Sequence, residues 1–360
     1  MKQNYPSILH HKYSLEDGHV TEQVTSVEGY RGIIIANKSK EQPNQTPFSS
    51  VLSLKTIKEN PDLLKQANVA AVHIHHGSLA PKFEFLKEKY GIPLFVSFRG
   101  NDATAYPKKK GNLKRLKKLF RTADLFFPVC EHLKQEIIRL GCHEDKIRVL
   151  YGGIDLNRFE CRPRIVDSKK KIRFLAIGRF VEKKGFANLI RAFAKVKKSY
   201  TQVELILIGR GPLEEEYRKL IKKLELGSSV EIVPWVDYRK IEKKYYRSHI
   251  FCAPSCTDQN GNQEGIPNTL TEAMATGMPV IASIHAGIPE LVKDKVSGLL
   301  VPEGSVDELA KAMKWLIKHP EKWENLGVNA RKKVETDFNL PLQLKRQKEY
   351  YDEVLINRME

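Results

Sequence analysis

Short apolar runs alternate with amphipathic stretches along the chain, most regularly in its second half. β-Branched runs predict buried strands, and apolar residues at helical spacing predict helices between them. The expected strands of the second half are 172–177, 203–208, 230–233, 249–253 and 279–282, and the expected helices are 185–198, 213–224, 238–247 and 268–276. Glycine and proline are frequent in the connections. Such alternation indicates βαβ units around a parallel sheet.

The first half repeats this alternation less regularly. Strands are expected at 69–74, 93–98, 125–129 and 147–150, with weaker patterns at 7–10 and 32–36, and helices at 81–90, 112–121 and 131–140. The stretch 160–171 is polar, contains Pro163 and lacks periodicity, which is typical of a linker. The pattern therefore predicts an α/β protein with two Rossmann-like domains, residues 1–160 and 161–338. A helix in 339–360 is expected to return to the first domain.

Composition narrows the class of protein. The 360 residues suffice for two ordinary domains, and 41% hydrophobic with 29% charged residues is typical of a globular chain. The apolar runs are shorter than the roughly 20 residues that span a bilayer, and the first 12 residues lack a signal-like apolar core. We therefore expect a cytoplasmic protein. The net charge of +18 favours anionic partners without choosing among nucleic acid, lipid headgroups and phosphorylated substrates.

A glycine-flanked basic segment follows the strand at 172–177. It begins at Gly178 and Arg179, ends at Lys184 and Gly185, and opens a helix. Glycine allows a tight turn and a close approach to a ligand. Fixed cations at the carboxyl end of a sheet favour a leaving group that develops negative charge, such as a diphosphate. Taken alone, the segment is equally consistent with a turn that carries solvated lysines.

A second segment offers acceptors and donors together. Glu264 and Glu272 are separated by seven residues, and Asn268 is expected to cap the helix that follows. Backbone N–H groups at a helix start attract anions, and carboxylates accept hydrogen bonds from sugar hydroxyls. The alternative is an ordinary capped helix with acidic residues near its positive end.

Together these segments resemble the donor site of retaining glycosyltransferases of family 4, which have the GT-B fold of two Rossmann-like domains facing across a cleft. The similarity extends from about residue 171 to residue 329. It implies an acceptor-binding first domain, a nucleotide-sugar-binding second domain, and transfer of a sugar from a nucleotide diphosphate-sugar without a cofactor. Family members in bacteria often build envelope polysaccharides on lipid carriers, so the implied acceptor is a glycan or a lipid-linked intermediate.

The resemblance also implies roles for individual residues. Arg179 and Lys184 would bind the diphosphate, Glu264 would hold hydroxyls of the donor sugar, and Glu272 would bind the ribose. The segment near the base would be Pro234, Trp235 and Val236; the turn at Gly178 and the helix start formed by Gly265, Ile266, Pro267, Asn268 and Thr269 would cover the sugar and phosphates. Arg210 departs from the family, which more often has an acid there.

No D-x-D sequence occurs in the chain. Metal-dependent transferases use such carboxylates to hold a divalent ion against the diphosphate, whereas here Arg179 and Lys184 supply equivalent charge. We therefore expect no catalytic metal.

The first domain carries a second group of candidate residues. His73, His75 and His76 end a predicted strand, and an alternating strand places His73 and His75 on one face and His76 on the other. A metal site is the less favoured interpretation, because no acidic or cysteine ligand is close in sequence. By resemblance, His75 and His76 would line the cleft.

Arg99 and Asp102 follow the next strand. By resemblance, Arg99 stands where many relatives carry a histidine near the reacting centre. An arginine can stabilise charge there but cannot serve as a base. Asp102 would orient Arg99 or touch the acceptor, and the alternative for both is a structural turn.

The segment from Lys108 to Arg121 contains eight cations in fourteen residues. Leu113, Leu116 and Leu119 form an apolar side among them. One interpretation is a helix packed on the core with solvated lysines. The other is a site for an anionic membrane surface or a lipid diphosphate acceptor, which would make the protein peripheral on the inner face of the cytoplasmic membrane.

Two other functions remain open from the sequence. Sugar phosphorylases and nucleotide-sugar epimerases share the double-domain architecture, and a nucleoside diphosphate product would separate them from a transferase. The charge of +18 is also consistent with a nucleic-acid-binding protein. However, lysine runs alone supply only salt-dependent, nonspecific affinity for nucleic acid. Because no RNA- or DNA-binding signature accompanies them, no specific nucleic acid is expected as a partner.

Overall fold

The structure is a computed structural model that describes residues 5–11, 18–36, 51–165 and 171–356. The chain forms two compact units. Met1–Gly153 together with Leu340–Glu360 make the amino-terminal unit, and Ile154–Asn339 make the carboxy-terminal unit. The division lies ahead of the expected linker at 160–171, of which residues 166–170 are outside the described part. Residues 154–165 belong to the carboxy-terminal unit because they are bonded to it, for example through Arg162 N–H to the Thr276 carbonyl at 3.1 Å.

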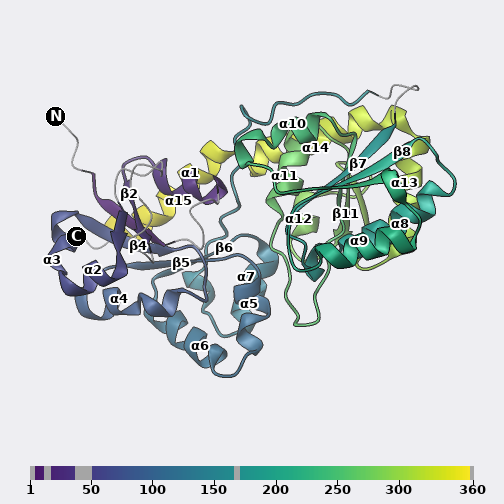
Figure 1. The fold of residues 1–360 in the computed structure, drawn as a ribbon. Helices are drawn as coiled ribbons and strands as arrows, with labels where there is room; N and C mark the ends of the chain where they lie inside the picture. Colours follow the sequence, from purple (N-terminus) through teal and green to yellow (C-terminus); the bar gives the residue numbers. More distant parts are fainter. Residues whose placement is uncertain (1–4, 12–17, 37–50, 166–170, 357–360) are drawn as a thin grey trace. The chain divides into compact units, whose positions relative to one another are not determined.

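In the described residues, the amino-terminal unit contains a six-stranded parallel sheet in the order β3-β2-β1-β4-β5-β6 (Figure 1). Its strands are β1 (Ser7–His11), β2 (Arg31–Ala36), β3 (Val51–Ser53), β4 (Val69–Ile74), β5 (Leu94–Phe98) and β6 (Leu125–Pro128). Its helices are α1 (Gly18–Thr25), α2 (Leu54–Glu59), α3 (Asp62–Gln66), α4 (Glu84–Tyr90), α5 (Asn101–Thr104), α6 (Asn112–Thr122), α7 (Glu131–Arg139) and α15 (Leu340–Leu355).

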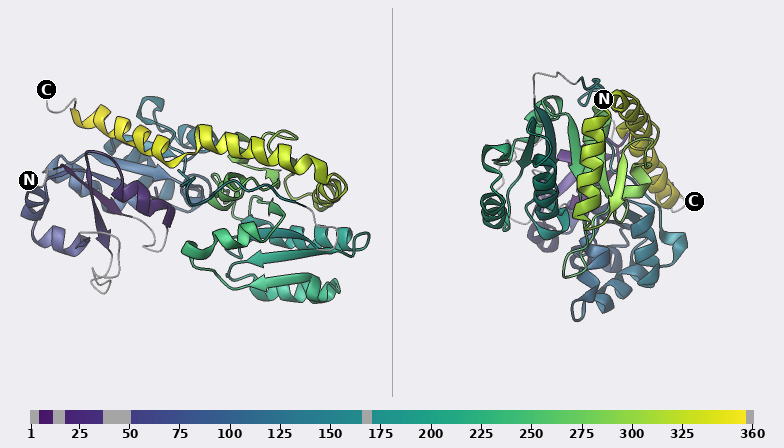
Figure 2. Two further views of the ribbon diagram at one scale, coloured as in Figure 1. Left: turned by 90° about the horizontal axis from the view of Figure 1, so that it is seen from above. Right: turned by 90° about the vertical axis from the view of Figure 1, so that its right-hand side faces the viewer.

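The last helix of the chain, α15, completes this unit. Tyr351 is fully buried and stacks on Phe95 of β5 with ring centroids 5.0 Å apart. Ile8, Ala71 and Phe127 belong to the same apolar cluster. Figure 2 shows α15 lying along the strands of this sheet. An apolar helix face commonly packs on one side of a sheet. Here this packing places the first strand and the last helix of the chain in one hydrophobic core.

The strand expected at 147–150 is wrong. Ile147 makes only an isolated bridge to Phe126, and the N–H groups of Arg148 and Leu150 donate to the β6 carbonyls of Phe126 and Pro128. The segment therefore runs beside β6 without a continuous ladder. The apolar pattern identified a buried segment, but strand pairing also needs regular backbone bonds, which periodicity does not report.

The described part of the carboxy-terminal unit has a second six-stranded parallel sheet, in the order β12-β11-β10-β7-β8-β9. Its strands are β7 (Ile172–Ile177), β8 (Val203–Ile208), β9 (Val230–Val233), β10 (Ile250–Ala253), β11 (Val280–Ile284) and β12 (Leu299–Pro302). Its helices are α8 (Phe186–Lys197), α9 (Glu214–Lys223), α10 (Glu242–Tyr246), α11 (Asn268–Ala275), α12 (Ile288–Leu291), α13 (Val306–Lys318) and α14 (Trp323–Asp337). α8 packs beside α9 and α13, and α11 packs on α14 (Figure 1).

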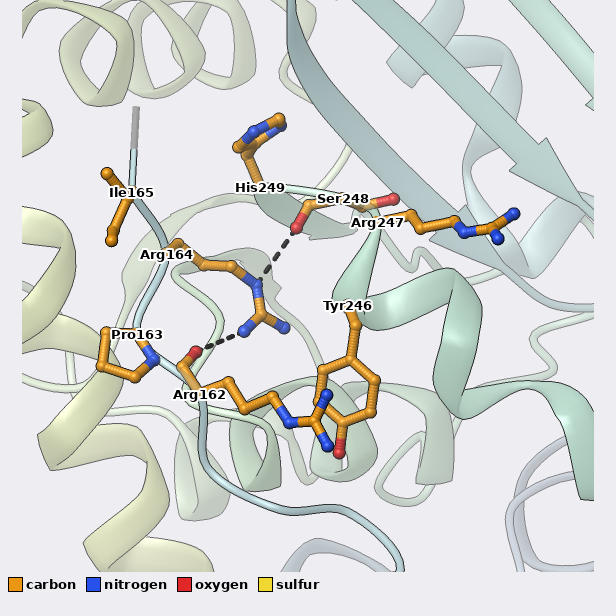
Figure 3. Close-up of a pocket in the computed structure, with 8 residues that line it drawn as sticks. All are labelled: Arg162, Pro163, Arg164, Ile165, Tyr246, Arg247, Ser248 and His249. Carbon is orange, nitrogen blue, oxygen red and sulfur yellow. Dashed lines mark hydrogen bonds between the residues drawn. The ribbon is translucent and has the colours of Figure 1, made fainter. Parts of the chain in front are cut away.

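A hollow of about 260 Å³ lies among residues 162–165 and 246–249, where the chain enters β10 (Figure 3). Arg164 extends into it and donates to the carbonyls of Ser248, Tyr245 and Thr276 at 3.1, 3.3 and 3.2 Å. Tyr245 and Thr276 stand at the carboxyl ends of α10 and α11, where a cation is stabilised by the helix dipole. Burial lowers the pKa of Arg164 to about 10, so it remains charged at neutral pH. These bonds occupy the guanidinium, so Arg164 has a structural role: it connects the segment before β7 to the ends of α10 and α11.

Replacing Arg164 by methionine is expected to destabilise the carboxy-terminal unit by about 2 kcal/mol, because buried carbonyls lose a charged donor. Arg162→Met is the matched control. Arg162 pairs with Glu160 at the surface, at 2.7 Å, and an exposed pair contributes about 0–1 kcal/mol. Urea unfolding of both variants measures the difference, and equal midpoints would contradict this role of Arg164.

Candidate functional site

The carboxyl ends of β7 and β10 lie side by side where the strand order changes direction. β8 and β9 follow β7 on one side, whereas β10, β11 and β12 lie on the other. Ligands of open parallel sheets bind at such a switch point. The chain leaves β7 at Gly178 and β10 at Pro254. The structure therefore brings the two segments selected from the sequence to one edge of the sheet.

The turn after β7 approaches the segment after β10 closely. Gly185 has φ +66°, and a Cβ atom there would lie 1.8 Å from the carbonyl oxygen of Pro254. A Cβ at Gly178 would lie 3.2 Å from Cε of Lys184. Cys256 N–H donates to the carbonyl of Lys183 at 2.9 Å, which joins the two segments through the backbone. Glycine is required at 185 by both the dihedral angle and the contact.

Two lysines face the carboxylate of Glu264. Lys184 Nζ lies 3.0 Å from Oε1 and Lys183 Nζ lies 3.6 Å from Oε2. All three side chains are largely buried. Burial would raise the pKa of Glu264, but Lys184 and Lys183 outweigh that effect and lower the pKa to about 2. The carboxylate is therefore ionised at neutral pH, and the pair of lysines leaves a net positive charge beside it.

Sequence reasoning selected Lys184 and missed Lys183. Lys183 also contacts the carbonyl of Gln263 at 3.3 Å and Oδ1 of Asn262 at 3.4 Å. Both lysines belong to the short 3₁₀ turn Glu182–Lys184, which directs the two neighbouring side chains to the same carboxylate. The adjacent lysines in the sequence were the available signal, but their pattern did not indicate that both turn inward.

A histidine and a second glutamate stand behind Glu264. The backbone N–H of Glu264 donates to Nε2 of His285 at 3.1 Å, and Nδ1 of His285 lies 2.7 Å from Oε2 of Glu303. His285 follows β11 and Glu303 follows β12. Sequence reasoning missed both residues, because they lie 21 and 39 positions after Glu264 and only the sheet brings the three together.

The helix start after Glu264 differs from the expected cap. Pro267 stands at the N-cap of α11, and no side chain caps the helix, so the cap predicted at Asn268 is wrong. Asn268 is instead the first helical residue. Proline has no N–H and sets the backbone angle for helix entry. Within the described residues, the N–H groups of Asn268 and Thr269 have no acceptor. This helix start therefore offers two donors and the positive end of a dipole.

Glu272 lies in the second turn of α11 and is 1% exposed. Its Oε2 accepts a hydrogen bond from the Tyr245 hydroxyl at 2.5 Å. Burial, and then the charge of Glu272, raise the pKa of Tyr245 well above its usual range. Tyr245 therefore keeps its proton and donates a hydrogen bond to Glu272 at every ordinary pH. Tyr245 is a further residue that the sequence pattern did not indicate.

The other expected donor residues also follow strands at this edge of the sheet or adjoin Glu264. Arg179 is exposed directly after Gly178, and its guanidinium makes no hydrogen bond or ion pair with the described residues. Pro234, Trp235 and Val236 follow β9, and Trp235 is 49% exposed. An unpaired guanidinium and an exposed aromatic ring are accessible to a ligand. Gly265 and Ile266 occupy the segment between Glu264 and α11.

The amino-terminal unit has its own switch point, between β1 and β4. His10 of β1 lies with His73 and His75, which come from β4 and the residue after it. Nδ1 of His10 is 3.0 Å from Nε2 of His75, and the three rings offer nitrogen atoms within 4.8 Å of one another. These histidines could supply metal ligands, a grouping that the sequence did not predict because His10 is remote from the other two.

Hydrogen bonds use the same ring nitrogens. His73 contacts the Tyr351 hydroxyl at 2.6 Å and Ser97 Oγ at 2.7 Å, and Arg99 Nη2 lies 3.3 Å from Nδ1 of His75. Burial, His10 and Arg99 lower the pKa of His73 well below its usual range. A neighbouring guanidinium also opposes a second cation. The arrangement therefore favours a neutral hydrogen-bonded network over an ion site.

Arg99 is held by this network. Its Nε donates to the His75 carbonyl at 3.0 Å, and Nη2 donates to Gln23 Oε1 at 3.3 Å. Asp102 is fully buried and accepts hydrogen bonds from the N–H groups of Gly77, Arg99 and Gly100 at 2.8, 2.9 and 3.0 Å. Asp102 thus fixes the turn that presents Arg99.

The two remaining histidines of the motif differ in exposure. His75 is 2% exposed and bonded to His10 and Arg99. His76 is partly exposed, and its Nδ1 lies 2.8 Å from Ser78 Oγ and 3.7 Å from Asp102 Oδ2. His75 can therefore act on a ligand only through its neighbours, whereas His76 is accessible.

Two family models match the chain. The Glycosyltransferase Family 4 model matches residues 17–158, and the Glycosyl transferases group 1 model matches residues 157–333. The amylovoran biosynthesis glycosyltransferase AmsK of Erwinia amylovora is 34% identical over 274 residues, which are 76% of this chain and 67% of that protein. WcaL of Escherichia coli K12, named as a candidate colanic acid biosynthesis glycosyltransferase, is 32% identical over 243 residues. These are 67% of this chain and 60% of WcaL, so the chain spans less than two thirds of that relative.

Solved structures share the fold over nearly the whole chain. A glycosyltransferase from Rickettsia africae ESF-5 has a TM-score of 0.80 at 20% identity, covering 98% of this chain and 99% of that one. Anabaena HepE in complex with UDP-glucose has a TM-score of 0.80 at 18% identity, covering 97% and 100%. At this identity the likeness establishes the two-sheet GT-B fold.

Proposed function

Because the chain belongs to the group 1, family 4 glycosyltransferases, we propose that it transfers a sugar from a nucleotide diphosphate-sugar to a glycan or lipid-linked acceptor, retaining the anomeric configuration. One observation supports this above all. The Lys184–Glu264 pair lies beside a helix start with open N–H donors, at the switch point of a parallel sheet. Cations and N–H groups suit a diphosphate, and a fixed carboxylate suits sugar hydroxyls.

Binding of the donor would separate the Lys184–Glu264 ion pair, with one residue binding the diphosphate and the other the sugar. Lys184 would turn from Glu264 toward the diphosphate, where Arg179 adds a second charge. Glu264, still facing Lys183 at 3.6 Å, would accept hydroxyls of the sugar. In this assignment Glu272 binds the ribose, and Pro234, Trp235 and Val236 lie near the base. The N–H groups of the α11 start stabilise the charge that develops on the leaving phosphate.

The charge state of Glu264 favours a role in binding over a role as base or nucleophile. A carboxylate with a pKa of about 2 is a weak proton acceptor at neutral pH. We therefore assign the acceptor's proton to the leaving phosphate, with attack on the same face of the sugar. Arg99 would stabilise charge near the reacting centre, and its permanent charge excludes it as the base.

A donor screen tests the proposed reaction. Thermal unfolding is measured with UDP-, GDP-, ADP- and dTDP-sugars, since a bound ligand raises the melting temperature by mass action. Relatives suggest two of these: HepE was crystallised with UDP-glucose, and a Mycobacterium tuberculosis relative, 28% identical over 196 residues, is named as a GDP-mannose-dependent mannosyltransferase. The donor that binds should then release its nucleoside diphosphate when an acceptor is added. Phosphate-dependent cleavage or an epimerised nucleotide-sugar would instead indicate a phosphorylase or an epimerase.

Transfer is expected to continue in excess EDTA. Arg179, Lys184 and the α11 start supply the positive charge that a divalent ion would otherwise provide. The rate of nucleoside diphosphate release with EDTA, and with EDTA followed by excess magnesium, is the measurement. Loss of transfer in chelator that returns with magnesium would contradict the assignment.

The acceptor side includes a basic face formed by residues 108–121, which run from the turn before α6 into that helix. Leu116, Leu119 and Phe120 are buried, whereas Leu113 is 37% exposed among the cations. Lys118 pairs with Glu88 at 2.8 Å and Glu84 at 3.2 Å. The other cations of the segment are exposed: Lys108, Lys109, Lys110, Lys114, Arg115, Lys117 and Arg121. Among the described helices, none has the length and apolar character of a bilayer span. We assign this face to an anionic lipid surface that carries the acceptor.

Reversing charge on this face is expected to weaken binding to anionic vesicles. Each lysine near such a surface contributes about 1 kcal/mol, so the triple change Lys109→Glu, Lys110→Glu and Lys114→Glu should lower affinity by about 100-fold or more. Lys219→Glu, Lys222→Glu and Lys223→Glu on exposed α9 form a control of equal charge.

Cosedimentation with phosphatidylglycerol vesicles measures binding to lipid, and the same assay with a DNA duplex at matched salt measures binding to nucleic acid. If the two triple variants lose equal affinity for the vesicles, binding depends only on net charge and not on this face. Tighter binding to the duplex than to the vesicles would favour the nucleic-acid interpretation.

A further inference from the structure

The segment that carries Glu264 is held at its backbone by two side chains from neighbouring strands. Glu264 N–H donates to Nε2 of His285 at 3.1 Å, and His285 is 2% exposed. Oε1 of Glu303 accepts from Thr257 N–H at 2.5 Å, while Oε2 lies 2.7 Å from Nδ1 of His285. The two side chains thus hold both ends of residues 257–264, which contain no helix or strand.

The hydrogen bonds define the protonation of His285. A backbone amide can only donate, so Nε2 carries a lone pair and the ring proton is on Nδ1. That proton is donated to Glu303. Burial would raise the pKa of Glu303, but the Thr257 amide and His285 outweigh it and lower the pKa. An ionised Glu303 therefore orients the ring so that its acceptor faces Glu264, as a carboxylate orients a ligating or catalytic histidine elsewhere.

Few other contacts could replace this arrangement. Lys183 Nζ contacts the Gln263 carbonyl at 3.3 Å and Glu264 Oε2 at 3.6 Å, so it holds the neighbouring carbonyl and the carboxylate but not the N–H. Without an acceptor, the buried Glu264 N–H would be left without a hydrogen bond, which is unfavourable. The segment would then move to hydrate it, and the carboxylate would move with the backbone.

We propose that His285 and Glu303 are positioning residues that hold the Glu264 carboxylate in register with Lys184, and so set the recognition of the donor sugar. The proposal rests on the proposed function, in which Glu264 binds sugar hydroxyls. The dyad acts on the sugar and not on the nucleotide, because its contacts reach Glu264 and Thr257 and none of the residues assigned to the base or the ribose.

The test compares His285→Ala with His285→Gln. Alanine removes the acceptor, whereas the amide oxygen of glutamine can reach the position of Nε2. A misplacement of about 1 Å in a site costs on the order of 10²-fold, so His285→Ala should lower kcat/KM to that extent. His285→Gln should restore most of it. The dissociation constant of the nucleoside diphosphate alone should stay within about twofold, while that of the intact nucleotide-sugar rises. General loosening of the fold would weaken both ligands, so the ratio of the two constants separates positioning from stability.

Glu264→Ala and a double variant complete the design. If His285 acts through Glu264, Glu264→Ala/His285→Ala should be no slower than Glu264→Ala alone, because coupled residues are not additive. His319→Ala is the matched control, since His319 also pairs with a glutamate through Nδ1, Glu321 at 3.0 Å, but on an exposed turn after α13. It should keep normal kinetics.

The outcomes are distinct. Impaired Glu264→Ala with normal His285→Ala would overturn the positioning role, and so would additive losses in the double variant. Normal turnover in Glu264→Ala would instead overturn the assignment of Glu264 to the donor sugar, and the absence of nucleoside diphosphate release from the unchanged chain would overturn the proposed function itself. If His285→Ala does not fold, Glu303→Gln replaces it. Thr257 and His285 donate to different oxygens of Glu303, and glutamine replaces one of these oxygens by an NH2 group that cannot accept. This variant should therefore show the same change in the ratio of constants, and an unchanged ratio would overturn the proposal.

Discussion

Lys184→Ala should lower sugar transfer by about 10²–10³-fold while the chain stays folded. Loss of one fixed donor to a developing anion typically costs that much. Lys183 still faces the Glu264 carboxylate at 3.6 Å, so the buried charge keeps a partner and the fold should survive. Nucleoside diphosphate release measures the rate, and thermal unfolding measures the fold.

Glu264→Ala should lower transfer at least as strongly as Lys184→Ala in the same assay, to a residual rate, because the sugar loses its carboxylate and two lysines lose their shared partner. Glu264→Gln keeps the shape and removes the charge, which separates hydrogen bonding from electrostatics. Lys222→Ala, on the exposed face of α9, is the control for removal of a lysine. Near-normal turnover in both Lys184→Ala and Glu264→Ala would refute the site assignment.

Gly185→Ala should destabilise the carboxy-terminal unit by roughly 2–4 kcal/mol and reduce transfer as well. The left-handed backbone at φ +66° costs a non-glycine residue about 1–2 kcal/mol. The remainder comes from the Cβ atom, which would lie 1.8 Å from the Pro254 carbonyl and force the turn after β7 away from the segment after β10. Lys184 would move with that turn.

Gly227→Ala separates the two contributions. Gly227 also has positive φ, +46°, but a Cβ there would meet nothing within 4 Å. It should show only the cost of the dihedral angle. Urea unfolding of the two variants gives the difference. Equal destabilisation would show that the contact with Pro254 is absorbed without strain, and normal transfer in Gly185→Ala would separate the turn from the site.

The strands that form the centre of each sheet were predictable from short apolar runs. Strand 172–177, for example, is observed as β7 over the expected residues. Buried parallel strands read as continuous apolar segments, because both faces are covered. The edge strands β3 and β12 were not predicted as strands. They have three and four residues, and such short runs do not differ from apolar loops in sequence.

The candidate site was predictable only where its residues are close in sequence. Gly178, Lys184, Glu264 and Glu272 form local motifs, so their spacing carried the signal. His285, Glu303 and Tyr245 support these residues from other strands and helices. Nothing in their own neighbourhoods marks them as partners of the motif, and the cap expected at Asn268 was displaced by Pro267.

By itself, the sequence determined the alternation of strands and helices, the two Rossmann-like folds and the family, because these depend on local periodicity and on contiguous motifs. Only the tertiary structure decided which motifs meet. The order β12-β11-β10-β7-β8-β9 places the ends of β7 and β10 together, and the pairing of distant strands leaves no trace in local spacing. The same holds for His10, which joins His75 because β1 pairs with β4.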